Sequence, residues 1–151
     1  MFCQDVMLSV VHTCHPADSA RSCAQVMASE HIGMLPVVDE RDRLVGVVTD
    51  RDLALRVLGQ GLPWNTQVGD VMSGAPLLTC SPHEDLHAVE ARMGKLKKTR
   101  ALVVDAQERC VGIISLSDVA RFEDDPHAGR LLREVTQRES VHIVRAQSHL
   151  T

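Results

Sequence analysis

The chain has 151 residues, a hydrophobic share of 44%, a mean hydropathy of −0.03 and a formal net charge of −4. A chain of this size buries enough apolar surface to fold without metals or disulfides, and its acidic balance argues against a general nucleic-acid binder. The longest apolar runs are too short to span a membrane, and the aromatic residues Phe2, Trp64 and Phe122 are too few for a base-stacking surface.

Cysteine usage indicates a reduced environment. The five cysteines are an odd number, and no two of them have C-x-x-C spacing. Residues 1–11 have no basic start and only a short apolar stretch, which is unlike a signal peptide. We therefore expect a cytoplasmic protein with free thiols and no membrane association.

The first predicted elements are an extended stretch that ends at Thr13-Cys14 and a helix over residues 18–31. Pro16 and Asp18 are typical of a helix start. A β-hairpin should follow, because residues 35–39 and 44–49 are rich in β-branched residues and flank a polar turn. A second helix is expected over residues 50–58. Residues 59–66 contain two glycines and a proline, which is the composition of a linker.

The second half of the chain repeats the first half. Matching residues recur 66 positions later, without a gap, from Thr13 to Ala54. Upstream, Asp5-Val6-Met7 recurs 65 positions later as Asp70-Val71-Met72. The chain therefore contains two copies of one β-α-β-β-α unit. The strongest matches are Thr13 with Thr79, Cys14 with Cys80, Pro16 with Pro82, Met27 with Met93, Val37-Val38-Asp39 with Val103-Val104-Asp105, Gly46 with Gly112, and Asp52 with Asp118.

In the second copy, a helix is expected to open at Ser81-Pro82-His83-Glu84, with its amphipathic part over residues 84–98. Ser81 would be its N-cap, Pro82 its first residue, and Glu84 would reach back to close a capping box. Two strands over residues 101–104 and 110–114 and a helix over residues 117–122 complete the copy.

The tail has no match in the first copy. Asp125-Pro126 is a good helix start, and Leu131, Leu132 and Val135 form an apolar stripe after it. Residues 141–144 are expected to form a short strand. The predicted fold class is α/β (α+β), with two repeats packed as a pseudo-twofold pair. Its parts are repeat 1 (1–58), a linker (59–66), repeat 2 (67–123) and a C-terminal helical tail (124–151).

Residues 83–87 read HEDLH, which has the spacing of a zinc-protease motif. In the middle of a helix, both histidines would bind one zinc ion and the glutamate would act as the base for a bound water. Here Pro82 places the motif at a helix start, and no motif supplies a third ligand. His83 and His87 also align with Ala17 and Arg21 of the first copy. We therefore expect no metal site, no catalytic residue and no enzyme activity.

A glycine, two aliphatic residues, a hydroxyl residue, two variable positions and an aspartate occur at residues 46–52 and again at 112–118. Each copy is preceded by Asp-Val-Met, and the element order is the same in both. This pattern resembles a tandem pair of CBS domains, also called a Bateman module. The resemblance covers residues 5 to 122.

The resemblance implies a binding site for AMP, ADP, ATP or S-adenosylmethionine between the copies. The hydroxyl of Thr49 or Ser115 would hold a phosphate or ribose oxygen near a helix N-terminus, where free N–H groups attract anions. Asp52 or Asp118 would accept hydrogen bonds from both ribose hydroxyls. The adenine would meet the backbone near Thr13 and Thr79, while Arg51 and Arg100 (with Lys98) would contact phosphate. No cofactor is required by this scheme.

Alternatives remain for these residues. Thr and Asp at a helix start are also ordinary capping residues. The second copy has Leu116-Ser117 where the first has Asp50-Arg51, so one site is either degenerate or tuned to another ligand. Residues 12–15 include His12, Cys14 and His15, which form either a metal or redox site or a buried thiol beside surface histidines.

Two functions follow from these alternatives. The first is a regulatory module that senses an adenosyl ligand. The second is a structural dimerisation module with vestigial nucleotide sites. The expected partners are an adenosyl small molecule, a second copy of the chain and an unidentified protein, and nucleic acid is not expected. In the second function, the helices at 18–31 and 84–98 offer apolar faces for the pairing.

Overall fold

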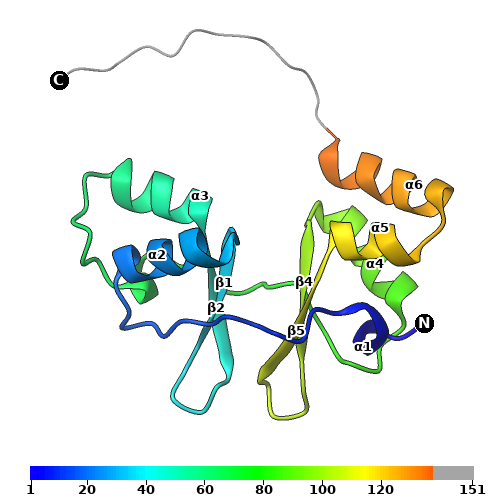
Figure 1. Ribbon diagram of the computed structural model, residues 1–151, viewed down its shortest axis with the longest axis horizontal. Coiled ribbons are helices and arrows are strands. Elements are labelled where there is room, and N and C mark those ends of the chain that lie inside the picture. Colours follow the sequence, from blue (N-terminus) through cyan, green and yellow to red (C-terminus); the bar gives the residue numbers. More distant parts are fainter. Residues whose placement is uncertain (138–151) are drawn as a thin grey trace, which may run out of the picture.

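Two small sheets form the centre of the molecule, one from each half of the chain (Figure 1). The computed structural model describes residues 1–137. The first sheet pairs β1 (Met34–Val38) with β2 (Leu44–Thr49). The second has the order β3 (Thr79–Cys80), β4 (Arg100–Val104) and β5 (Cys110–Ser115). The predicted α+β class and both hairpins are confirmed.

The two hairpins are equivalent in detail. Met34 pairs with Thr49 in the first hairpin, and Arg100 pairs with Ser115 in the second. Each register shifts by a bulge at the same place, between residues 37 and 38 and between residues 103 and 104. The expected first strand of repeat 1 is reduced to one parallel bridge between Cys14 and Val37. Its counterpart in repeat 2 is the short strand β3, where Cys80 pairs with Val103.

Each repeat has one helix before its hairpin and one after it. The first of these are α2 (Ala20–Glu30) and α4 (Leu86–Leu96). After β2, α3 (Asp50–Asp52) continues into a π-helical stretch, η1 (Leu53–Leu58); after β5 comes α5 (Leu116–Phe122).

The predicted capping box at Ser81 is wrong. Helix α4 begins four residues later than expected, at Leu86, and its N-cap is Asp85. Only half of the box exists: the Ser81 N–H donates to Glu84 Oε2 over 3.3 Å. The physical reason lies at the other end of the chain. The Leu86 N–H donates to the carbonyl of Met1, and the Cys3 N–H donates to the carbonyl of Glu84, so Asp85 between them is held extended in a bridge to Phe2.

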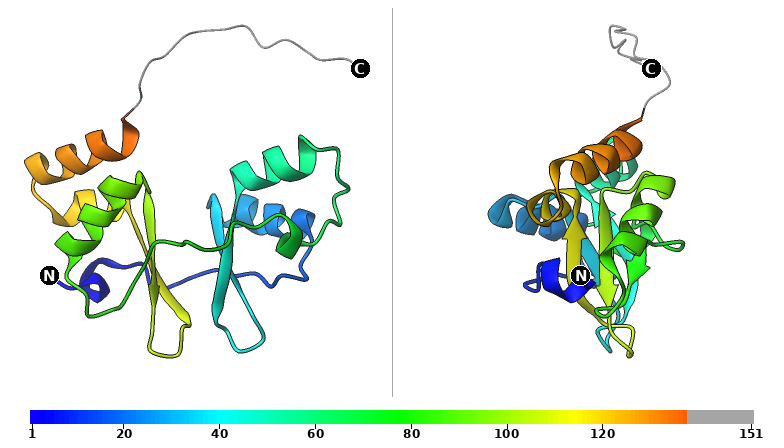
Figure 2. Two further views of the ribbon diagram at one scale, coloured as in Figure 1. Left: turned by 180° about the vertical axis from the view of Figure 1, so that it is seen from behind. Right: turned by 90° about the vertical axis from the view of Figure 1, so that its right-hand side faces the viewer.

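The segments that precede the two repeats are exchanged. Helix α1 (Cys3–Val6) packs into the core of the second repeat, although it precedes the first. The short 3-10 helix η2 (Val68–Asp70) places Val68 in the core of the first repeat. Figure 2 shows the two connecting segments crossing between the repeats in opposite directions.

Two glycines permit the close approach of these exchanged segments. A Cβ on Gly46 of the first repeat would lie 2.7 Å from the sulfur of Met72. A Cβ on Gly112 of the second repeat would lie 2.9 Å from Cγ of Met7. The repeated glycine and the repeated Asp-Val-Met therefore form one packing unit, which joins residues from opposite halves.

Helix α6 (Asp125–Thr136) covers α4 and α5 of the second repeat. The predicted start at Asp125-Pro126 is confirmed, with Asp124 as N-cap. Leu131 and Val135 of the predicted stripe are buried, whereas Leu132 is 49% exposed. The strand expected over residues 141–144 lies outside the described residues. Within residues 1–137, no helix is both long and apolar enough to cross a membrane.

Candidate functional site

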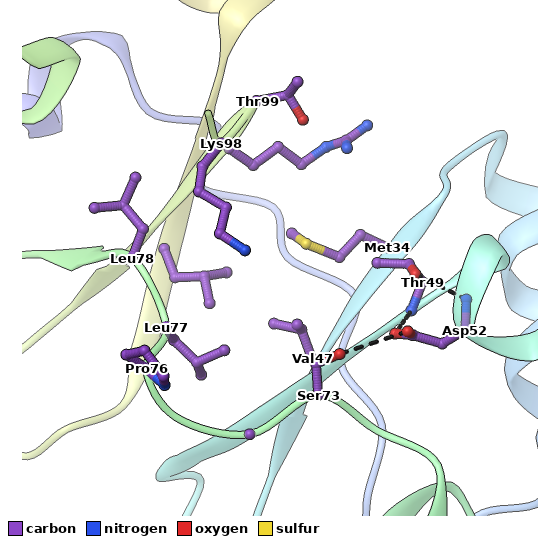
Figure 3. A pocket seen from close by; sticks show the side chains of 13 residues that line it. Met34, Val47, Thr49, Asp52, Ser73, Pro76, Leu77, Leu78, Lys98 and Thr99 are labelled. Carbon is purple, nitrogen blue, oxygen red and sulfur yellow. Dashed lines mark hydrogen bonds between the residues drawn. The ribbon is translucent and has the colours of Figure 1, made fainter. Parts of the chain in front are cut away.

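Two cavities lie between the repeats, one at each Thr/Ser–Asp pair. The first has a volume of about 220 Å³ and is shown in Figure 3. Thr49 and Asp52 form one side of it, and Lys98 reaches in from the opposite side. It is lined by Met34, Val47, Thr49, Asp52, Ser73, Gly74, Pro76, Leu77, Leu78, Lys98, Thr99, Arg100 and Leu102.

In the first cavity, both oxygens of the Asp52 carboxylate are occupied by protein groups. The Thr49 N–H donates to Asp52 Oδ2 over 3.0 Å, and the Asp52 N–H donates to the Thr49 hydroxyl over 3.1 Å. The Ser73 hydroxyl donates to Asp52 Oδ1 over 3.5 Å, and Arg56 Nε lies 3.7 Å from the same oxygen. The pair therefore caps α3 and also fixes the segment that contains Ser73.

The second cavity is larger, at about 530 Å³, and lies at Ser115 and Asp118. The Ser115 N–H and hydroxyl both donate to Asp118 Oδ2, over 2.8 and 2.6 Å. Among the described residues, Asp118 Oδ1 makes no hydrogen bond, in contrast to Oδ1 of Asp52. The residues that line this second cavity are Leu8, Val10, Val11, His12, Glu30, His31, Ile32, Gly33, Met34, Arg100, Ile113, Ser115, Ser117, Asp118 and Arg121.

Repeat symmetry relates the two cavities. Val47, Thr49 and Asp52 of the first correspond to Ile113, Ser115 and Asp118 of the second. The charged groups differ more. Lys98 stands in the first cavity where the second has Ile32, and the second adds Arg121, whereas Arg100 lines both.

The structure brings together five of the eight predicted site residues. Thr49, Asp52 and Arg100 line the first cavity, and Ser115, Asp118 and Arg100 line the second. Thr13 and Thr79 line neither, but each directly follows a lining residue, His12 or Leu78. Arg51 lines neither cavity and is exposed. The roles of all eight residues in ligand binding stay predictions.

Sequence reasoning did not select Ser73 or Arg121 as site residues. Ser73 belongs to the segment that precedes the second repeat. It lines the cavity at Thr49 and Asp52 of the first repeat because the two connecting segments are exchanged. Arg121 lies one helical turn after Asp118, so the i, i+3 spacing on α5 was the available signal.

The residues His12, Cys14 and His15 do not gather into one site. Cys14 is buried beside Cys23, and their hydrogen bond together with burial raises the pKa of the Cys14 thiol. His12 turns to Glu30, with Nε2 3.3 Å from Oε2. His15 Nδ1 accepts from the N–H of Ala17. Of the two predicted alternatives, the buried thiol describes Cys14.

Comparison with known proteins identifies the repeated unit. The CBS domain family matches residues 3–59 and 68–125. The CBS domain-containing protein YhcV of Bacillus subtilis is 36% identical over 140 residues, which cover 92% of this chain and 97% of YhcV. An inosine-5′-monophosphate dehydrogenase of Mycobacterium tuberculosis is 33% identical over 125 residues, but these cover 23% of that enzyme.

Two solved structures of similar chains contain adenosyl compounds. The CBS domain pair of protein MJ0100, in complex with 5′-methylthioadenosine and S-adenosyl-L-methionine, is 28% identical with a TM-score of 0.72 and covers 81% of this chain and 98% of that one. CBSX2 in complex with AMP is 28% identical with a TM-score of 0.69, over 80% of this chain and 94% of CBSX2.

Proposed function

The chain belongs to the CBS domain family, and on that premise we propose that it is a regulatory module that binds an adenine nucleotide in the cavity at Ser115 and Asp118. One observation carries the choice of cavity: within residues 1–137, Oδ1 of Asp118 accepts no hydrogen bond, and Asp118 lines the larger of the two cavities. A carboxylate oxygen in that position accepts from ribose hydroxyls without breaking the helix cap, which uses Oδ2. The proposal assigns no catalytic step to the module.

Cavity size supports the same choice. Small-molecule sites commonly enclose about 300–1,000 Å³. The second cavity, at about 530 Å³, falls within this range, whereas the first, at about 220 Å³, falls below it. We infer that the two sites are unequal and that the second binds the ligand more tightly.

Beside the carboxylates of Glu30 and Asp118, the second cavity offers two arginines that suit a phosphate group. Arg100 and Arg121 both line it, and guanidinium groups bind phosphate oxygens through paired N–H donors. S-adenosylmethionine carries a positive sulfonium instead. We therefore rank AMP, ADP and ATP above S-adenosylmethionine, although the related MJ0100 pair contains the latter.

Isothermal titration calorimetry on ligand-free protein tests the proposal. We expect heat with at least one of AMP, ADP and ATP, and a weaker response with S-adenosylmethionine. Asp118→Asn should lower nucleotide affinity about ten- to a hundredfold, because a hydrogen bond to a charged group contributes about 1.5–3 kcal/mol. Asp52→Asn is the matched change in the other cavity and should change the same affinity less than about threefold.

Substitutions of Arg121 and Arg51 distinguish phosphate binding in the second cavity from phosphate binding at the start of α3. Arg121→Gln should weaken nucleotide binding if the cavity-lining guanidinium groups hold the phosphate. Arg51→Gln should not, because Arg51 is exposed and lines neither cavity. If Arg51→Gln weakened binding and Arg121→Gln did not, the phosphate would instead lie at the start of α3. If calorimetry of the parent chain gave no heat with any of the ligands, the nucleotide proposal would be rejected.

A structural dimerisation module is the second candidate. Its support is an exposed apolar surface on η1, where Leu55 is 52% and Leu58 is 80% exposed. Such residues are often covered by a partner. We infer that this surface pairs with a second copy of the chain in the cytoplasm. Light scattering tests it: a monomer at micromolar concentration contradicts the dimer, and a dimer that ignores every nucleotide favours the structural function.

A further inference from the structure

Four side chains that can bind metal ions meet on the far side of the second repeat, away from both cavities. His87 and Glu90 come from α4, Glu123 directly follows α5, and His127 comes from the first turn of α6. One ligand atom from each lies within 4.8 Å of the other three. The three helices pack together at this end of the molecule (Figure 1).

The central residue of the cluster is Glu90, whose side chain is only 5% exposed. Its Oε2 lies 3.5 Å from Nδ1 of His87 and 3.8 Å from Nε2 of His127. Its Oε1 is buried and has no hydrogen-bond partner among the described residues. Folded proteins rarely leave a buried carboxylate oxygen without a partner, so this atom indicates a missing ligand.

The separations suit a tetrahedral ion. Four nitrogen or oxygen ligands at about 2.0–2.1 Å from a zinc ion lie about 3.3–3.4 Å from one another. From Oε2 of Glu90 the distances are 3.5 Å to Nδ1 of His87 and 3.8 Å to Nε2 of His127, and one ligand atom from each residue lies within 4.8 Å of the other three. Binding would therefore bring the four ligand atoms closer together, which rotation of the exposed side chain of His87 permits.

A further carboxylate lies near one of the histidines. Oδ1 of Asp124 lies 4.0 Å from Nδ1 of His127, while Nε2 of the same ring faces Glu90. A metal-bound imidazole usually donates its other N–H to a carboxylate, which fixes the ring. Asp124 is also the N-cap of α6 and accepts from the backbone N–H of His127, so the start of this helix lies beside the cluster.

We propose that His87, Glu90, Glu123 and His127 bind one divalent transition-metal ion, which fastens α6 to the second repeat. Two imidazoles select zinc and its neighbours over magnesium and calcium, which prefer oxygen ligands. Two carboxylates balance the charge of the ion. The ion supplies the partner that the buried oxygen of Glu90 lacks.

The site belongs to the second half alone. Repeat symmetry would place its four counterparts at Arg21, Ala24, Val57 and Gly61, and none of these binds metals in proteins as a rule. The HEDLH stretch contributes only its last residue. Within it, His83 is exposed and Glu84 pairs with Arg92, so neither faces the cluster.

Zinc titration of the full chain, after removal of metals with a chelator, tests the proposal. We expect one zinc ion per chain, measured by calorimetry, and little heat with magnesium. Glu90→Gln and His127→Gln should each weaken zinc binding at least tenfold. His83→Gln removes a histidine from the same stretch but outside the cluster, and it should bind zinc as the parent chain does.

A second readout concerns α6. Zinc should slow hydrogen exchange of the α6 amides in the parent chain, and it should do so much less in Glu90→Gln. Circular dichroism without metal shows whether each variant is folded. His127 is 40% exposed, so its replacement tests the site even if the Glu90 variant unfolds. Absence of zinc binding, or binding that survives both substitutions, overturns the proposal.

Discussion

Replacing Val6 by alanine is expected to destabilise the second repeat, although Val6 precedes the first. The side chain is 5% exposed and belongs to the core cluster that includes Leu86 and Ile114. The neighbouring backbone reinforces this attachment, because the Leu8 N–H donates to the carbonyl of Ile113 over 2.9 Å. The substitution shortens one buried side chain and leaves the hydrogen bonds in place.

The expected loss follows from the size of the deletion. Valine to alanine removes two carbon groups, and each buried methylene contributes about 0.8 kcal/mol. The cavity left behind adds to this, so the free energy of unfolding should fall by about 2 kcal/mol. For a chain of this size the melting temperature should fall by about 4–8 °C.

Urea unfolding and amide hydrogen exchange measure the effect and its location. Protection should fall in β4, β5 and α4 before it falls in β1 and β2. Val10→Ala is the matched control: Val10 is 71% exposed, and its loss should stay within about 0.5 kcal/mol. Loss of protection in β1 and β2, with β4 and β5 unchanged, would refute the exchange of segments.

Two further predictions follow from the hairpins. The Gly46→Ala variant should melt at a lower temperature than the parent in a thermal scan, because its Cβ would lie 2.7 Å from the sulfur of Met72 and 2.9 Å from the Ser73 carbonyl oxygen; an unchanged melting temperature would show that this segment moves freely. The backbone N–H of Arg109, and then its guanidinium group, hold the pKa of Asp105 below its ordinary value, so this carboxylate stabilises the fold above that ordinary value and loses its contribution as the pH falls through the lowered pKa. Urea unfolding should therefore show Asp105→Asn less stable than the parent at pH 7, with the gap narrowing in acid; a constant gap would contradict the assignment.

The repeated hairpins and helices could be predicted because their signals are local. Alternation of β-branched residues, polar turns and helical spacing all lie within a few residues of the elements they specify. The bulge positions are equivalent because Val37-Val38-Asp39 and Val103-Val104-Asp105 repeat the same residues. The offset also relates residues that line the two cavities, such as Asp52 and Asp118.

The start of α4 could not be predicted in the same way. Ser81, Pro82 and Glu84 form a good helix start in isolation, but Met1 and Cys3 take the backbone groups of residues 84–86. That competition comes from the opposite end of the chain. The cluster of His87, Glu90, Glu123 and His127 was missed for a similar reason: its residues come from α4, from the residue after α5 and from α6, and only His87 and Glu90 share a helix.

The inequality of the cavities was expected, but which one is larger was not. The departure of Leu116-Ser117 from Asp50-Arg51 suggested that the second site is the altered one. In the structure the second cavity is the roomier, and residues of the connecting segments line both cavities beside those of the motif. Cavity volume depends on these distant partners, which the motif does not describe.

The exchanged segments also bear on how such a chain can arise. A single repeat with its own Asp-Val-Met segment has no internal group to cover the glycine at position 46 or 112, since in this chain each glycine is covered from the other half. Two separate single-repeat chains would have to trade segments with each other and would exist as a swapped dimer. When residues 59–66 join the two repeats in one chain, the exchange of segments becomes intramolecular, and each repeat is present at a high effective concentration around the other. Duplication and fusion would then turn a concentration-dependent assembly into a unit that folds at any dilution.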